Sequence, residues 1–229
     1  MQSLRRSGAN GCVVDALRNA VRCERRIQPK RDILRQDEVP QHAHLLLTGL
    51  AYRFRVLGDG RRQITALIVP GDLCDLEACM NGRAKCGLAA VGACTLGEIP
   101  LREIVDAYTA EPRMVQAVWR SFMRDEAIAR EWLLNIGQRP ALERTAHLFC
   151  ELRARLQAVG LVSEEGYELR LTQVDLADVL GLTPVHMNRV MRAMRERGLV
   201  RLAGGRLNIL DVPALEKFAE FDPAYLQVR

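Results

Sequence analysis

The residues best suited to chemistry lie between Thr183 and Arg206, where arginines recur. A guanidinium group can donate two parallel hydrogen bonds to guanine O6 and N7, or it can bind phosphate. The charged residues of this segment are Arg189, Arg192, Arg195, Arg197, Arg201 and Arg206, against Glu196 alone, a local excess of five positive charges. The whole chain has a formal net charge of +5. Charge gathered in this way predicts contacts with nucleic-acid phosphates.

Arg189 lies on a predicted helix whose two faces differ. At about 100° per residue, Val185, His186 and Arg192 lie within about 60° of Arg189. The residues on the opposite side are apolar and are expected to pack inward: Met187, Val190, Met191 and Met194. We therefore expect Arg189 to be the main base reader. His186 and Asn188 are placed to read bases or bind phosphate, and Arg192 to bind phosphate.

Local signals predict the elements that must position this helix. Thr172 is followed three residues later by an aspartate, a pair typical of a capping box, which predicts a helix from Gln173. Gly181 supplies the tight turn of a helix-turn-helix. Thr183 then caps the second helix, with Pro184 at its first position.

Two short alternating stretches follow the second helix, at residues 199–202 and 206–210. The glycine pair between them suits a tight hairpin turn, so we expect a wing beside the helix-turn-helix. The predicted DNA-binding residues are Thr172, Gln173, Thr183, Pro184, Val185, His186, Asn188, Arg189, Arg192 and Arg206.

The first half of the chain has a different pattern. Between about Arg26 and Glu98 it shows short strands broken by turns, with the clearest strands at 44–49, 51–57 and 63–69. Residues 58–60, Gly-Asp-Gly, tolerate positive φ and predict a hairpin between the last two strands. Turn signals at this spacing predict an antiparallel sandwich or roll.

Residues 112–136 predict one long helix, because they contain no glycine and their apolar residues recur mostly three or four apart. Those residues are Val115, Val118, Trp119, Phe122, Met123, Ile128, Trp132 and Leu133. Such a helix spans nearly 40 Å at about 1.5 Å per residue, more than a small β-domain needs for cover. We expect it to pair with its twin across a two-fold axis, the alternative being a helix that packs within its own chain.

Gly137 and Pro140 mark the end of this helix and the start of another, which runs from about residue 140 to 158. The predicted domains are therefore a β-roll sensor at 1–110, a dimerisation helix at 111–137 and a winged helix-turn-helix at 138–229. Together they make an α+β fold.

Several classes of protein are disfavoured. No apolar run approaches the roughly 20 residues that span a bilayer, and the N-terminus lacks a signal-peptide core, so we expect a cytoplasmic protein with no membrane partner. Seven cysteines at irregular spacing fit reduced thiols in a cytosol. The common motifs of phosphate-loop, serine-hydrolase and zinc-protease enzymes are not found, so we expect no enzyme, no catalytic residue and no metal site.

The chain resembles the Crp/Fnr family of bacterial regulators at its β-roll turns (Gly49, residues 58–60 and 70–72), its long helix and, most specifically, residues 171–210. The resemblance implies a cyclic-nucleotide-binding-like β-roll and a homodimer that binds imperfect palindromes in double-stranded DNA and often contacts RNA polymerase. Many members read bases with a Glu-x-x-(Ser or Gly)-Arg set. The matching stretch here runs from Val185 to Arg189, so the arginine is kept and the glutamate is replaced.

The ligand chemistry of the sensor differs from that of the family's best-known members. Cyclic-nucleotide members carry a ribose-binding glutamate and an Arg-Ser pair for the phosphate, whereas residues 71–88 contain no Arg-Ser pair. The candidate effector residues are Asp72, Asp75, Glu77, Lys85 and Cys86. Iron-sulfur members carry closely spaced N-terminal cysteines, which Cys12 and Cys23 do not match. No cofactor is therefore predicted.

Two further interpretations of the sensor stay open. Cys74, Cys79, Cys86 and Cys94 either bind a soft metal or respond to oxidation, or they serve as small core side chains, which we favour. His42 and His44 are either ligands of a metal or haem, or structural residues. The structural role is the commoner one for two histidines near a strand. The alternative to a DNA-binding regulator is a cyclic-nucleotide-binding module that acts on a protein partner, which predicts an intact phosphate cassette and no basic reading helix.

Overall fold

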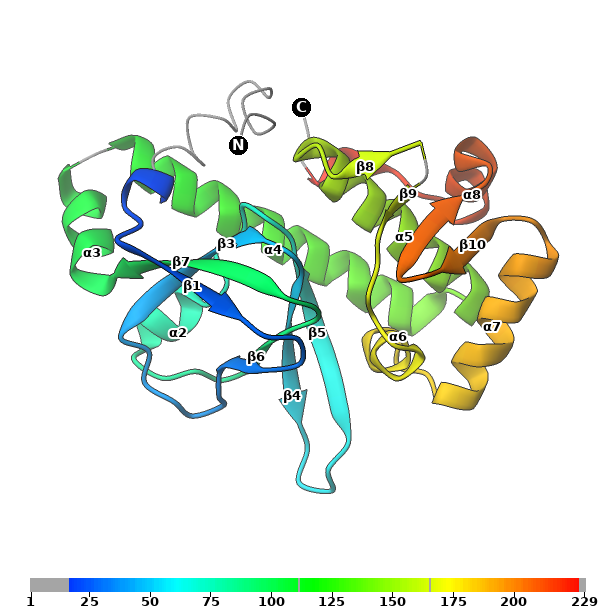
Figure 1. Cartoon of the computed structure of the whole chain (residues 1–229), viewed down its shortest axis with the longest axis horizontal. Coiled ribbons are helices and arrows are strands. Elements are labelled where there is room, and N and C mark those ends of the chain that lie inside the picture. Colours follow the sequence, from blue (N-terminus) through cyan, green and yellow to red (C-terminus); the bar gives the residue numbers. More distant parts are fainter. Residues whose placement is uncertain (1–16, 111, 165, 227–229) are drawn as a thin grey trace. The chain divides into compact units, whose positions relative to one another are not determined.

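The computed structural model describes residues 17–110, 112–164 and 166–226 (Figure 1). The chain divides into two compact units, residues 1–125 and 126–229. Antiparallel sheets and helices together confirm the predicted α+β class. The finer division at 1–110, 111–137 and 138–229 stays a prediction. Within the described ranges, no helix is long and apolar enough to cross a membrane.

The first unit is built on antiparallel strands, as the sequence predicted. One sheet has the order β1 (Cys23–Ile27), β7 (Cys94–Pro100), β3 (His42–Thr48). The other has the order β2 (Asp32–Leu34), β6 (Gly87–Ala90), β4 (Ala51–Val56), β5 (Arg62–Ile68). The pairing of β4 with β5 confirms the predicted hairpin, and in its turn Leu57 N donates to Arg61 O at 2.8 Å.

The core of the first unit lies between these sheets. Leu34 and Leu88 from one sheet and Leu46 and Leu96 from the other belong to a single buried cluster. The turn between β3 and β4 requires glycine, because Gly49 has φ +81° and a Cβ there would lie 2.6 Å from the carbonyl oxygen of residue 93. Two helices, α2 (Leu76–Asn81) and α3 (Leu101–Ala110), were not predicted.

The long helix α4 (Pro112–Gln138) confirms the helix predicted at 112–136. Gly137 lies within its last turn, so the helix ends just before Pro140, which precedes the next helix. Its apolar residues do not share one environment, since Ile128 and Trp132 are buried while another set is exposed. The exposed set is Trp119, Phe122, Met123, Leu133, Leu134 and Ile136.

The second unit contains the predicted helix-turn-helix and wing. Its helices are α5 (Ala141–Ala158), α6 (Gln173–Leu180), α7 (Pro184–Glu196) and α8 (Val212–Phe218), followed by the 3₁₀ helix η1 (Pro223–Leu226). The wing strands β10 (Val200–Ala203) and β11 (Arg206–Ile209) pair as predicted. The sheet then continues through β9 (Gly166–Glu168) to β8 (Val162–Ser163), two strands that were not predicted.

The contact between β9 and β11 requires a glycine. Gly166 has φ +95°, and a Cβ at this position would lie 2.0 Å from the backbone oxygen of Leu207. No other residue type fits so close an approach of two strands. This pairing ties the wing to the segment that leads into the helix-turn-helix.

Candidate nucleic-acid interface

The start of α6 is fixed by the predicted capping box. Thr172 Oγ1 accepts a hydrogen bond from Asp175 N at 3.1 Å, and Asp175 Oδ2 accepts one from Thr172 N at 3.0 Å. Both side chains therefore satisfy helix-end amides that would otherwise lack partners. The Thr172 hydroxyl already serves as the cap of α6. A contact between Thr172 and DNA stays a prediction.

The turn between the two helices also forms as predicted. Gly181 ends α6 in the left-handed region at φ 63°, where glycine carries no steric penalty. Thr183 Oγ1 accepts from His186 N at 3.2 Å and caps α7, with Pro184 in its first turn. Arg144 of α5 donates to the carbonyl oxygen of Leu180 at 2.6 Å and so holds the end of α6. The orientation of α7 is thus set at its first residue.

The two faces of α7 separate as the sequence predicted. Met187, Val190 and Met194 are buried, and Met191, also predicted to pack inward, is half-buried. The residues exposed to solvent are Val185, His186, Asn188, Arg189 and Arg192. Within the described residues, the Arg189 guanidinium has no hydrogen bond or ion pair, so its donors are available to a ligand. An outward arginine near the start of the second helix is placed as a base reader requires.

Other predicted contact residues have partners that the sequence did not reveal. Asn188 Nδ2 donates to Gln173 Oε1 at 3.0 Å and joins α7 to α6. Arg206 Nη2 donates to Ser163 Oγ at 2.9 Å and to the backbone oxygen of Gly166 at 3.2 Å. These partners lie 15 to 43 residues away in the chain, beyond the range of any local pattern. Arg206 therefore braces the wing sheet.

The other arginines of this segment lie on α7, directly after it, or on β10. Arg192 lies 3.5 Å from Glu196, an exposed pair that holds its guanidinium only weakly. Arg197 stacks over the ring of Phe218, 5.8 Å from its centroid. Arg195 and Arg201 are exposed. A helix-turn-helix whose second helix is flanked by exposed cations suits a phosphate-lined duplex.

A buried polar cluster lies beneath the helix-turn-helix, between the end of α4, α5 and η1. His147, 1% exposed, is 3.1 Å from Asn135 Nδ2 through Nδ1 and 3.2 Å from Glu131 Oε1 through Nε2. The rings of Phe221 and Tyr225 lie 5.2 and 6.0 Å from its imidazole. The imidazole thus joins the last turns of α4 to the C-terminal segment of the same unit.

We expect this cluster to make the second unit acid-sensitive. Burial, and secondly the charge of Arg139, lowers the pKa of His147 to about 4. An unfolded histidine titrates near 6.5, so its stabilising contribution is complete above about pH 6.5 and falls as the pH approaches 4. Urea unfolding of the wild type and of His147→Phe at pH 7 and 4.5 checks this. The wild type should lose more stability than the variant, and equal losses would contradict the assignment.

The candidate effector residues of the first unit surround a very small cavity. Asp75, Glu77, Lys85 and Cys86 line it together with Arg53, and its volume is about 20 Å³. That is room for about one water molecule. The last candidate, Asp72, is not in this lining. Its carboxylate accepts from Arg124 at 2.6 Å and from Val69 N at 2.9 Å, which ties α4 to the turn after β5.

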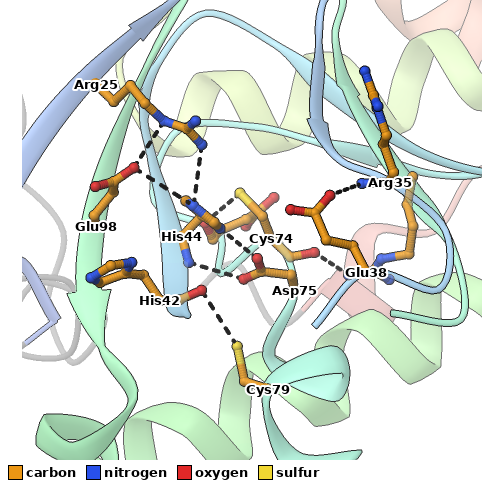
Figure 2. A network of polar contacts seen from close by, with 11 residues as sticks. Arg25, Arg35, Glu38, His42, His44, Cys74, Asp75, Cys79 and Glu98 are labelled. Atoms are coloured by element: carbon orange, nitrogen blue, oxygen red, sulfur yellow. Dashed lines mark hydrogen bonds and ion pairs between the residues drawn. The ribbon is translucent and has the colours of Figure 1, made fainter. Parts of the chain in front are cut away.

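His44 belongs to a buried network rather than to a ligand site (Figure 2). Arg25 Nη2 lies 3.4 Å from His44 Nε2, and since a guanidinium only donates, Nε2 must accept. The proton therefore sits on Nδ1, which donates to Asp75 Oδ2 at 2.5 Å. Arg25 also pairs with Glu98 at 2.8 Å. Both ring nitrogens of His44 are engaged, which favours the structural interpretation.

The cysteine thiols of the first unit favour the core interpretation. Burial raises the pKa of Cys79 to about 12 and that of Cys94 to about 11, and it also raises the pKa of Cys74 and Cys86. A protonated thiol is a poor nucleophile and a poor metal ligand. Among the described residues, no group of three or more His, Cys, Asp or Glu side chains could hold a metal ion. Cys12 lies outside the described residues.

Comparison with known proteins agrees with this arrangement. A model of the Crp-like helix-turn-helix domain matches residues 143–218, and a model of the cyclic nucleotide-binding domain matches residues 24–110. The nitrogen fixation regulation protein FixK of Azorhizobium caulinodans is 27% identical over 179 residues, which cover 78% of this chain and 71% of FixK. The transcriptional activator protein FnrL of Cereibacter sphaeroides is 28% identical over 169 residues, 70% of this chain and 65% of FnrL.

A solved structure shows the same fold. FixK2 from Bradyrhizobium japonicum superimposes with a TM-score of 0.75 at 22% identity, over 86% of this chain and 96% of FixK2. A cyclic-nucleotide-binding-like roll and a Crp-like helix-turn-helix define a class of DNA-binding transcription regulators. The chain combines these two domains and is similar along most of its length to regulators of the Crp/Fnr family.

The residues of this chain do not fit the cyclic nucleotide that the name of the first domain implies. Ligand pockets measure roughly 300–1,000 Å³, whereas the cavity among the candidate effector residues measures about 20 Å³. Lys85 is followed by Cys86 where cyclic-nucleotide members carry an Arg-Ser pair, so an ammonium group replaces the planar guanidinium fork of that pair.

Proposed function

We propose that this regulator works as a homodimer on a palindromic DNA site, with one copy of α7 in the major groove of each half-site and Arg189 as its main base reader. The observation that carries the proposal is the outer face of α7. There an exposed guanidinium without a partner in the described chain stands on a helix whose start is capped and whose inner face is buried. Such a donor pair matches guanine O6 and N7.

The dimer is supported by a mostly apolar seam on α4. Residues 119, 122, 126, 129, 133 and 136 follow the alternating three- and four-residue spacing of a coiled coil, and all of them are apolar except Glu126. Trp119, Phe122 and Leu133 in this seam are 61%, 53% and 74% exposed. Large side chains in one line are seldom left in water, and a second copy of the same helix presents the matching surface.

Replacing Trp119 and Phe122 together with serine should weaken self-association about 100-fold or more, because buried aromatic anchors dominate such interfaces. Sedimentation at micromolar concentration should show a dimer for the wild type and a monomer for the double variant. Met80→Ser, at an exposed apolar residue of α2, is the matched control and should stay dimeric. A monomeric wild type, or a dimeric double variant, would contradict the seam.

The remaining expectations follow from this role. A protein that binds promoter DNA works in the cytoplasm, and RNA polymerase is the partner that the family resemblance implies. The protein acts by binding alone and needs no catalytic residue. The alternative, a nucleotide-binding module that acts on a protein partner, is disfavoured by the small cavity and by the capped basic helix.

A further inference from the structure

An exposed valine stands beside the proposed base reader. Val185 is 65% exposed and lies in the first turn of α7, one helical turn before Arg189. Residues four apart share a helix face, so the two side chains point the same way. The turn is held in place, since Thr183 accepts from the backbone nitrogen of His186 at 3.2 Å. The position of Val185 relative to Arg189 is therefore fixed before any ligand binds.

The surface around Val185 is apolar as well as open. It forms one wall of a groove of about 600 Å³ whose apolar lining comes from Ala141, Leu142, Val185, Val190 and Ala193, with Arg189 at its side. Asn188 is turned toward α6 by its hydrogen bond to Gln173 at 3.0 Å. An occupant of this face thus meets a guanidinium and an adjoining branched apolar side chain.

The major groove of DNA offers a matching pair of groups. Guanine presents two acceptors to an arginine, and the C5 methyl of thymine is the apolar group on a base edge. Four residues of helix advance about 6 Å, less than two base-pair steps of about 3.4 Å. A thymine within two base pairs of the guanine would bring its methyl to Val185.

From this geometry we infer that Val185 is a specificity-determining residue that reads a thymine methyl next to the guanine bound by Arg189. The inference rests on the proposed function. A glutamate at this position, as in many Crp/Fnr sequences, would accept a hydrogen bond from cytosine N4. Valine has no acceptor, so the half-site preference moves from cytosine to thymine.

Replacing thymine with deoxyuridine tests the inference, because this change removes only the methyl group. The probe is a duplex selected by the intact protein from a randomised pool, with deoxyuridine in place of each thymine near the guanine. Wild-type affinity should fall about fourfold for each methyl that Val185 contacts, the value of one buried carbon group. Val185→Ala should bind the two duplexes equally, and Val185→Glu should come to prefer cytosine.

Controls separate this inference from the proposed function. Val105→Ala, at a valine of α3 that is 59% exposed, should keep the wild-type response to deoxyuridine. Replacing the guanine with 7-deazaguanine removes N7 and tests Arg189 alone. Loss with 7-deazaguanine but none with deoxyuridine at any thymine would overturn the role of Val185 and leave the proposed function standing. No loss with either base, or no selected duplex, would overturn both.

Discussion

Replacing Arg189 with alanine should weaken binding to a selected palindromic duplex by about 1–3 kcal/mol in each half-site, the value of a bidentate arginine–guanine pair. The loss should be confined to recognition. Arg189 is exposed and has no partner in the described chain, so its removal should leave the unfolding free energy unchanged within about 0.5 kcal/mol. Fluorescence anisotropy at one fixed salt concentration measures the change in affinity.

The proper control is an arginine that binds phosphate rather than a base. Arg192→Ala should weaken binding to all sequences alike and reduce the slope of log affinity against log salt by about one for each lost contact. Arg189→Ala should instead reduce the preference for guanine. If Arg189→Ala bound the selected duplex as tightly as the wild type, Arg189 would not be a base reader.

Replacing Glu151 with alanine should destabilise the second unit by about 3–5 kcal/mol, the usual cost of breaking a buried ion pair. Glu151 is fully buried on α5 and accepts from Trp132 Nε1 at 3.0 Å, from Tyr225 Oη at 2.9 Å and from Arg155 Nη1 at 3.3 Å. Alanine would remove the carboxylate that these three donors share. Burial raises the pKa of Glu151, and the charge of Arg155 is the largest effect that opposes this shift.

Urea unfolding can follow this change locally, because the chain has two tryptophans and Trp132 lies inside the cluster. In a Trp119→Phe background, the fluorescence of Trp132 reports on the second unit alone. Glu196→Ala removes an exposed glutamate from the same unit and should cost less than about 0.5 kcal/mol. Equal costs for Glu151→Ala and Glu196→Ala would show that the buried network contributes little.

Much of the helix-turn-helix was predictable from the sequence because its determinants are local. The Thr172 capping box, the Gly181 turn and the Thr183 cap each act within four residues of a helix end. The hairpin of β4 and β5 and the long helix α4 were predictable for the same reason. The separation of α7 into a buried and an exposed face followed from helical periodicity alone.

The features that sequence reasoning missed depend on distant partners. Residues 147, 151 and 155 of α5 are polar at four-residue spacing and resemble a solvated face, yet all three are buried. His147 and Glu151 have partners on α4, Glu151 has another on η1, and Arg155 pairs with Glu151. The four-residue spacing of these polar residues, together with Trp132 on the preceding helix, was the sequence signal that could have revealed the buried cluster. Arg206 was expected to contact DNA, but its bonds to Ser163 and Gly166 depend on strands β8 and β9, which are too short to predict.

The first unit also has features that depend on residues far apart in the sequence and could not be predicted from it. The missing Arg-Ser pair was visible in the sequence, but the size of the cavity depends on how Arg53, Lys85 and Cys86 converge from separate elements. The engagement of His44 by Asp75 and Arg25 likewise joins residues far apart in the chain (Figure 2). Contacts between residues far apart in the chain produce no periodic pattern in the sequence.

Selection of binding sites from randomised DNA by the intact protein tests whether each α7 of a homodimer reads one half-site. We expect an inverted repeat with a guanine in each half and half-site centres about 10–10.5 base pairs apart, or a multiple of that spacing. Duplexes shortened to one half-site should bind far more weakly. Enrichment of a single asymmetric site, or no enrichment of any sequence, would contradict a homodimer that reads two half-sites through α7.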